Sequence, residues 1–308
     1  AEARGNVAQH RQIREQCGKH HGKDDHTGDN IAIDDGQRTL LYCRSSIIGA
    51  HRWGGIWLGD NHSSWSQLLA NIQMMPAVQM CGFLYSGADL CGFSEDTTPD
   101  LALRWLEFGL FTPLMRNHAG AESREQEFYR FTDVLPAIRN MLDLRYALLP
   151  YLYSEFMKAA LEDTPYFRPL AFDYPADPDA REVDDQLLLG EGLMVAPIHT
   201  QNAHGRTVYL PEGMKMLRLR SVSDYDEEVL PAGRHYLPCE LGEVLLFIRP
   251  GHTVPVAQPA ANTAQLDDTA LTFWRFAPDG QPAPYRMYTD DGVTTDHNKP
   301  EHWRIVGQ

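Results

Sequence analysis

The stretch Gly54-Gly55-Ile56-Trp57-Leu58-Gly59-Asp60-Asn61 contains a short apolar run that ends in an acid, with glycines and a tryptophan close by. A second stretch, Met115-Arg116-Asn117-His118, places an arginine and a histidine at the end of another apolar run. Apolar runs with polar tips are typical of strands in parallel α/β units, whose functional residues gather at the C-terminal strand ends. The two stretches therefore predict the strand ends of a (β/α) barrel.

Two more runs of this kind extend the pattern along the chain. The four predicted strands are Thr39 to Cys43, Gly55 to Leu58, Gly82 to Ser86 and Leu110 to Met115. Helix-like stretches, Ser64 to Gln79 and Thr98 to Phe108, lie between them. Strand, polar tip and helix in repetition predict consecutive units of one parallel barrel.

A long helical pattern follows the barrel units, and an all-β region follows the helix. Val134 to Leu161 carries apolar residues at spacings of three and four, with Asp133 as a possible cap and Pro150 predicting a kink or a division into two helices. The β-like runs are Gly190 to Ile198, Thr207 to Leu210, Val244 to Ile248 and Leu271 to Phe276. Short runs separated by Pro, Gly, Asp and Asn predict one or two β-sandwich domains. We therefore divide the chain into a polar, non-core segment (1–37), half of a barrel (38–163), a proximal sandwich (164–256) and a partial distal β domain (257–308).

Composition and charge exclude several classes of protein. The chain has 308 residues, 43% of them hydrophobic, and a net charge of −15. Such a field repels phosphate backbones and anionic lipids, so neither nucleic acid nor a membrane is an expected partner. The five cysteines, Cys17, Cys43, Cys81, Cys91 and Cys239, are odd in number and scattered, which argues against a disulfide framework and for a reducing, cytoplasmic location.

The polar segment at residues 1–37 contains histidines that could be read as metal ligands. They are His10, His20, His21 and His26. Adjacent histidines do not lie on one helix face, so a flexible solvated segment is the preferred reading. No metal and no cofactor is expected.

Asp60 is the first candidate for chemistry. Beside an apolar Trp57 platform, an acid is expected to have a raised pKa, which suits protonation of a leaving group. The alternative is that Asp60 caps the helix that follows it. The sequon Asn61-His62-Ser63 would place a glycan against this acid, so we do not expect it to be used.

The other strand ends also carry chemically useful side chains. Arg116 and His118 are one residue apart on a predicted strand and share a face, although a structural ion pair with a satisfied histidine is the more common explanation of an isolated Arg-x-His. Asp89 and Phe93 lie in a glycine-rich loop, and Arg44 follows the first run. Each signal alone is weak, but four on consecutive strand ends indicate one site.

These stretches together resemble glycoside hydrolase family 31, which includes the retaining α-glucosidases. The similar segments, in the order of the family, are RSS at 44–46, GGIWLGDN at 54–61, SGADLCGF at 86–93, PLMRNH at 113–118, LRYALLPYLYSEF at 144–156, LLLGEGLMVAPI at 187–198, VYLP at 208–211 and YTDDG at 288–292. The resemblance covers residues 38–308 and implies the second half of a (β/α)8 barrel followed by C-terminal β-sandwich domains.

The resemblance also implies a role for each candidate. Asp60 corresponds to the general acid/base, and Arg44 lies near it. Trp57 and Phe93 line the pocket for the terminal sugar, Arg116 and Asp89 organise its floor, and His118 bonds a sugar hydroxyl. The expected substrate is an oligosaccharide with non-reducing terminal α-linked glucose; an α-xyloside, a sulfoquinovoside or a non-catalytic sugar-binding subunit are the alternatives.

One departure from the family is decisive for the mechanism. Its nucleophile is an aspartate in a W-x-D-M-N-E-like motif, and nothing in this chain matches it; Asp34-Asp35 lacks the flanking residues. A single carboxyl group cannot form and release a glycosyl-enzyme intermediate. The expectation is therefore that this chain is the C-terminal part of a longer protein or split assembly and is inactive alone. Its expected partner is the missing N-terminal part, and the sequence leaves open a homo-oligomer.

Overall fold

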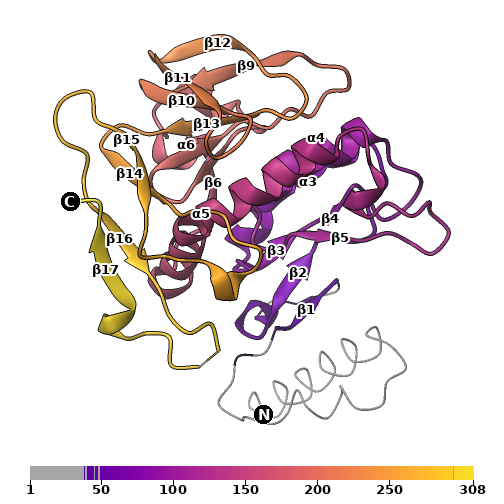
Figure 1. Ribbon diagram of the computed structural model, residues 1–308, viewed down its shortest axis with the longest axis horizontal. Helices are drawn as coiled ribbons and strands as arrows, with labels where there is room; N and C mark the ends of the chain where they lie inside the picture. Colours follow the sequence, from indigo (N-terminus) through magenta and orange to yellow (C-terminus); the bar gives the residue numbers. More distant parts are fainter. Residues whose placement is uncertain (1–37, 39, 45, 48, 294) are drawn as a thin grey trace.

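The computed structural model describes residues 38, 40–44, 46–47, 49–293 and 295–308. The predictions for Cys17, the N-terminal histidines and Asp34-Asp35 concern residues outside this set. The described part of the chain starts with a small parallel sheet backed by helices, continues through one long central helix, and ends in antiparallel sheets (Figure 1).

The parallel layer contains the strand ends that the sequence predicts. Strands β1 (Tyr42–Cys43), β2 (Gly55–Trp57) and β3 (Ser86–Gly87) pair in parallel, as do β4 (Asp89–Leu90) and β5 (Arg116–Asn117). The 3-10 helix η1 (Ala50–Arg52) lies between β1 and β2, and η2 (Phe128–Arg130) follows β5. The last predicted strand is displaced: its apolar residues complete the turn after a helix, and pairing begins at Arg116.

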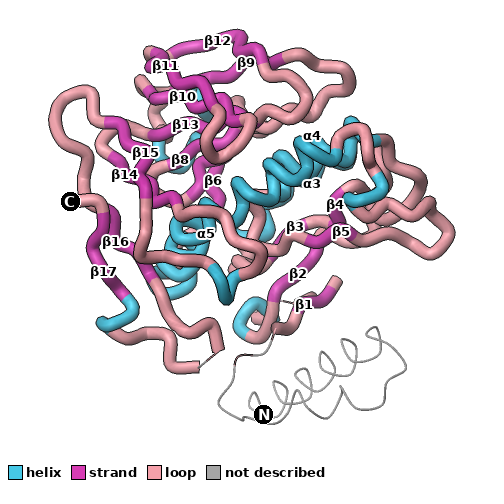
Figure 2. Tube along the Cα trace, viewed as in Figure 1, coloured by secondary structure: helices cyan, strands magenta, loops and turns pink. Residues whose placement is uncertain are grey.

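Two helices cover this sheet, α3 (Trp65–Met80) and α4 (Pro99–Gly109), both within a residue or two of the predicted stretches. The α4 residues Leu101, Trp105 and Leu106 are almost fully buried and belong to the main core. Both helices and the next one form a central group between the two sets of strands (Figure 2).

The long helix α5 (Leu135–Glu162) is continuous, so the predicted division at Pro150 does not occur. Val134, not Asp133, occupies the N-cap position, and it makes no side-chain cap bond. The buried residues Leu144, Leu148 and Tyr151 pack into the main core. This helix joins the parallel layer to the C-terminal strands.

The C-terminal region is centred on a six-stranded antiparallel sheet in the order β11-β10-β13-β8-β7-β6. Its strands are β6 (Phe167–Pro169), β7 (Leu187–Leu189), β8 (Leu193–Val195), β10 (Met214–Leu219), β11 (Tyr225–Leu230) and β13 (Val244–Ile248). The short helices α6 (Leu170–Asp173) and α7 (Pro178–Arg181) connect β6 to β7.

Both faces of the sheet are buried at its inner strand β13. Leu246 and Ile248 of β13 join the core that contains α5, whereas Leu245 and Phe247 join a second core beneath a two-stranded ribbon. That ribbon pairs β9 (Gly205–Leu210) with β12 (Gly233–Pro238). Because neighbouring side chains alternate between two apolar cores, the strand reads as a continuous apolar run.

Two further ribbons complete the chain. Strand β14 (His252–Val256) pairs with β15 (Thr272–Phe276), and β16 (Tyr285–Tyr288) pairs with β17 (Trp303–Val306). The 3-10 helices η3 (Thr263–Gln265) and η4 (Pro300–His302) lie in the connections. The expected boundary at 256/257 therefore falls between two paired strands.

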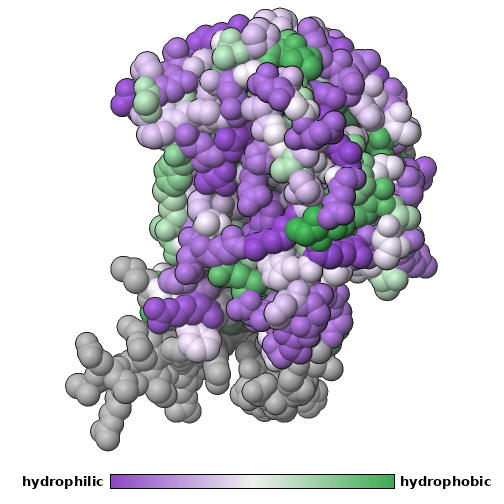
Figure 3. All heavy atoms as spheres, turned by 90° about the vertical axis from the view of Figure 1, so that its left-hand side faces the viewer, coloured by the Kyte–Doolittle hydropathy of each residue, from purple (hydrophilic) through white to green (hydrophobic). Residues whose placement is uncertain are grey.

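The cysteines differ from expectation at one position. Cys43 is disulfide-bonded, whereas Cys81, Cys91 and Cys239 are free thiols. Within the described part of the chain, no helix has the length and apolarity needed to cross a bilayer. The visible surface in Figure 3 is largely hydrophilic, with separated apolar patches.

Candidate functional site

The candidate site lies at the C-terminal ends of the parallel strands. Arg44 directly follows β1, Asp60 follows β2, and Asp89 follows β3 after one intervening residue. Asp89 is also the first residue of the short strand β4, where it pairs with Arg116, the first residue of β5. In Figure 1 these strands lie side by side, so residues distant in sequence meet at one edge. This is the edge at which barrel folds build their sites.

Asp60 is not a helix cap. The N-cap of α3 is Ser64, whose hydroxyl accepts a hydrogen bond from the Gln67 amide. The Asp60 carboxylate instead forms an ion pair with Arg44, and its side chain is 39% exposed. Gly59 immediately before it has a left-handed backbone (φ 86°), a conformation that glycine adopts without steric cost. The structure thus presents an exposed acid at a strand end rather than a carboxylate enclosed against Trp57.

Asp89 and Arg116 form the buried part of the site. The Asp89 side chain is fully buried, and its Oδ1 accepts hydrogen bonds from Nε of Arg116 (2.8 Å) and from Nη2 of the same guanidinium. Burial raises the pKa of Asp89. Interactions with Arg116 and His118 lower this pKa, whereas the charge of Asp60 raises it. These electrostatic interactions place His118 and Asp60 around the same buried carboxylate.

Aromatic rings surround the Arg116 guanidinium. It lies 5.3 Å from the Trp57 ring centroid and 5.5 Å from that of Tyr42, and these two rings make an edge contact at 5.9 Å. Phe93 and His118 form a second ring pair, with centroids 5.3 Å apart. The arrangement offers apolar ring faces and polar groups together, the combination used to bind small polar ligands.

The structure therefore brings all seven predicted residues to one end of the parallel layer. It adds two that the sequence argument did not assign, Tyr42 and Asn61. Tyr42 accepts a hydrogen bond from Nη1 of Arg116 at 3.3 Å. Asn61 is 4% exposed and fully hydrogen-bonded, so this sequon asparagine is unavailable for glycan attachment in the folded protein. Its place directly after Asp60 was the signal that could have found it.

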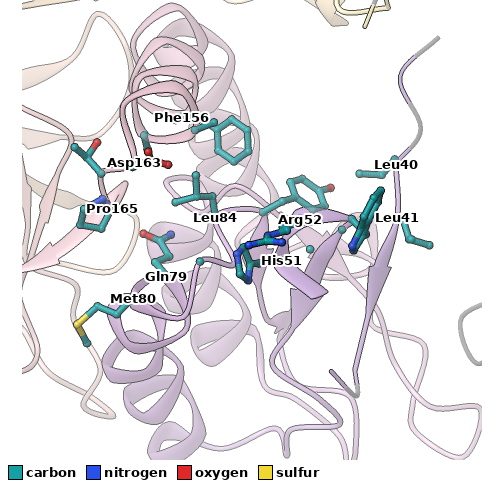
Figure 4. Close-up of a pocket in the computed structure, with 18 of the residues that line it drawn as sticks. Leu40, Leu41, His51, Arg52, Gln79, Met80, Leu84, Phe156, Asp163 and Pro165 are labelled. Atoms are coloured by element: carbon teal, nitrogen blue, oxygen red, sulfur yellow. The ribbon is translucent and has the colours of Figure 1, made fainter. Parts of the chain in front are cut away.

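A large cavity lies elsewhere, near the N-terminal end of β2. It has a volume of about 1090 Å³, and Leu41, His51, Leu84, Phe156 and Asp163 are among its lining residues (Figure 4). None of the seven candidate residues lines it. Among the residues that the structure describes, no group of three or more metal-binding side chains occurs. The seven candidate residues supply carboxylate, guanidinium, imidazole and aromatic groups.

Two family models match consecutive parts of the chain. The glycosyl hydrolase family 31 TIM-barrel domain matches residues 5–155, and the glycosyl hydrolase family 31 C-terminal domain matches residues 163–254. The similarity therefore begins well before residue 38, where the sequence argument placed its start. The division between the two models falls at the end of α5.

Individual proteins agree with the family models. An α-glucosidase from Hordeum vulgare is 33% identical over 91% of this chain, which covers 32% of that protein. The structure of the glucosidase II α subunit has a TM-score of 0.78 at 27% identity and covers 87% of this chain and 29% of its own. A family 31 α-xylosidase from Xanthomonas citri has a TM-score of 0.71 at 26% identity, covering 87% of this chain and 30% of its own. The chain spans about a third of the length of these proteins.

Proposed function

This chain belongs to glycoside hydrolase family 31, and we propose that the protein of which it forms part releases non-reducing terminal α-linked glucose from oligosaccharides with retention of configuration. The observation that carries the proposal is the exposed Asp60, paired with Arg44 beside the buried Asp89–Arg116 pair. An acid that is accessible to a substrate and adjoins a rigid polar floor can act on a bound glycoside.

In this proposal Asp60 is the general acid/base. As the acid, it donates a proton to the glycosidic oxygen while a nucleophilic carboxylate attacks the anomeric carbon and the carbon–oxygen bond to the leaving group breaks. As the base, it then takes a proton from a water molecule that attacks the anomeric carbon and displaces the carboxylate. The first step leaves Asp60 charged, and the adjacent Arg44 guanidinium stabilises that charge.

The nucleophile must be a different carboxylate, about 5–5.5 Å from Asp60. Asp89 is unsuited to this role because its side chain is fully buried and Arg116 occupies one of its oxygens. Nothing in the sequence of this chain matches the W-x-D-M-N-E-like motif that carries the family's nucleophile. We therefore propose that the nucleophile belongs to a part of the complete protein outside this chain. The chain alone is then expected to be inactive.

The remaining residues bind the sugar in this account. Trp57 and Phe93 present ring faces to the pyranose, and the exposed His118 bonds a hydroxyl group. The Asp89–Arg116 pair supports the floor from beneath, since the fully buried Asp89 fixes the guanidinium between Tyr42 and Trp57. Such buried pairing keeps the binding surface rigid.

A second sugar deserves a direct test because an α-xylosidase shares the fold at 26% identity. We propose measuring the complete protein against maltose, isomaltose and aryl α-glycosides of glucose, xylose and sulfoquinovose. Preference for the glucosides supports the proposal, whereas preference for the xyloside or the sulfoquinovoside replaces glucose with that sugar.

The same measurement distinguishes an enzyme from a non-catalytic subunit. Turnover of none of these glycosides, with retained binding of glucose, identifies a sugar-binding protein. If maltose is hydrolysed, Asp60→Asn tests the acid/base assignment; a loss in kcat of less than about tenfold contradicts it.

A further inference from the structure

We propose that Asn61 is a positioning residue that holds the Asp60 loop in register with β4 and with the loop carrying Phe93. The inference rests on the proposed function, since the group being positioned is the assigned proton donor. It concerns a side chain for which the sequence predicted no catalytic part.

The Asn61 amide is fully used in contacts between three segments. Its Nδ2 donates hydrogen bonds to Oδ1 of Asn71 on α3 (3.0 Å) and to the Asp89 carbonyl on β4 (3.2 Å). Its Oδ1 accepts a hydrogen bond from the Phe93 amide at 3.1 Å. With 4% exposure, this side chain makes these bonds away from water, where each is costly to lose.

The main chain continues the same connection. The Asn61 carbonyl accepts hydrogen bonds from the amides of Phe93 (2.8 Å) and Ser94 (3.0 Å), and the Ser63 amide donates to the Ser94 carbonyl at 2.9 Å. Gly92 lies so close to Ser63 that a Cβ at Gly92 would come within 2.5 Å of the Ser63 backbone. The two loops are therefore in direct contact along their length.

The loop that Asn61 holds has an unfavourable backbone. Cys91, Gly92 and Glu95 have φ angles of 76°, 88° and 69°, all in the left-handed region. For Cys91 and Glu95, which carry a Cβ, such conformations persist only when the surrounding structure holds them in place. Asn61 supplies bonds to the middle of this loop, at Phe93, from both its side chain and its carbonyl.

Asp60 depends on this anchor because it has little burial of its own. Its carboxylate is exposed and pairs with Arg44, which is itself 49% exposed. An exposed ion pair restrains a carboxylate weakly. The neighbouring buried Asn61 therefore sets where the Asp60 backbone lies relative to Asp89 and Phe93.

Asn61→Ala in the complete protein tests the inference. A displacement of about 1 Å in a reacting group can lower the rate about 100-fold, so we expect kcat/KM for maltose to fall about 10- to 100-fold. For 2,4-dinitrophenyl α-glucoside, whose leaving group departs without protonation, we expect a fall of less than about threefold. A role in stability alone lowers the amount of active enzyme and reduces both values equally.

Gln186→Ala is the matched control. Gln186 is a 2% exposed amide that exchanges two hydrogen bonds of 2.8 Å with the Tyr209 backbone in the sandwich region. It should lower thermal stability with no change in the ratio of the two kcat/KM values. If Asn61→Ala does not fold, Asn61→Asp keeps the acceptor for Phe93, loses both donors, and should show the same selective loss.

Three outcomes decide the matter. A selective loss on maltose supports positioning by Asn61. Equal losses on both substrates with an active parent protein overturn the positioning role and leave the proposed function intact. A parent protein that cleaves neither substrate refutes the proposed function, and the inference with it.

Discussion

Replacing Arg116 by methionine should destabilise the protein in a pH-dependent way. The change removes both hydrogen bonds to the fully buried Asp89 carboxylate and the contacts with Tyr42 and Trp57. A buried charge that loses its partner costs about 3–5 kcal/mol. Because the Arg116 side chain is 22% exposed, water can enter and replace part of the lost solvation, so we expect the lower end, about 3 kcal/mol.

The assay is thermal unfolding of the variant and its parent at several pH values. At about 2–4 °C per kcal/mol, the expected decrease in Tm is about 6–12 °C near neutral pH. The pKa of Asp89 is already raised by burial, and loss of Arg116 removes the main influence that lowers it. A carboxyl group with a raised folded-state pKa stabilises the fold most at low pH, and this contribution disappears as the pH rises through that pKa. The deficit of the variant should therefore be smaller at about pH 5 than at about pH 7.5.

A double variant provides the control. Adding Asp89→Asn to Arg116→Met leaves a neutral amide in the buried position, so at least half of the lost Tm should return near neutral pH. A single variant that unfolds within about 2 °C of its parent, or a double variant less stable than the single one, would refute the argument that a buried unpaired charge causes the loss.

Two other changes follow from the same kind of reasoning. The Glu107 carboxylate accepts hydrogen bonds from Arg104 and from the Gly242 amide, and burial raises its pKa from 4.5 to about 7. The free energy of unfolding should therefore fall as the pH rises from about 4.5 to about 7. Urea unfolding of Glu107→Gln should lack this part of the decline, and a pH profile unchanged from that of the parent would contradict the prediction. Gly59→Ala places a Cβ on a residue with a left-handed backbone, whereas the space around it is open, because the nearest non-neighbouring atom, on Arg44, is 3.8 Å from the new Cβ. We therefore expect the backbone strain alone to lower the free energy of unfolding by about 1–2 kcal/mol. An unchanged free energy of unfolding would show that the backbone relaxes.

The sequence predicted the parallel layer because each strand end carries an abrupt change from apolar to polar residues. It also located α3 and α4 closely, since their ends coincide with Ser64 and Pro99. It misplaced the last strand because Leu110–Leu114 is apolar for a different reason: this segment packs into the core as a turn after α4. Local composition cannot distinguish a buried turn from a buried strand.

The long helix α5 shows that a local sequence signal can also be overridden by the fold. Pro150 normally interrupts a helix, yet α5 continues past it. Leu148 and Tyr151 on either side are fully buried, so tertiary packing outweighs the local penalty. Packing of this kind depends on residues far away in the sequence and is not visible in the proline itself.

For the site, residue types and spacing were enough to select seven side chains that the fold brings together. The ion pair between Arg44 and Asp60 joins two strand ends. The family resemblance implied only that Arg44 lies near Asp60, and the pairing itself comes from the structure. Asn61 and Tyr42 were missed because their importance depends on bonds to distant parts of the chain, from Asn61 to a neighbouring loop and from Tyr42 on β1 to Arg116 on β5. Their roles follow from geometry that a single sequence does not contain.

The central claim, that Asp60 is the acid/base of a retaining α-glucosidase, is tested most directly by azide rescue of Asp60→Asn in the complete protein. With 2,4-dinitrophenyl α-glucoside as substrate, the variant should accumulate the glycosyl-enzyme, because no base activates water for the second step. Azide needs no base, so its addition should restore turnover and yield α-glucosyl azide. An Asp60→Asn protein that turns over maltose as its parent does, or that azide does not accelerate, would contradict the claim.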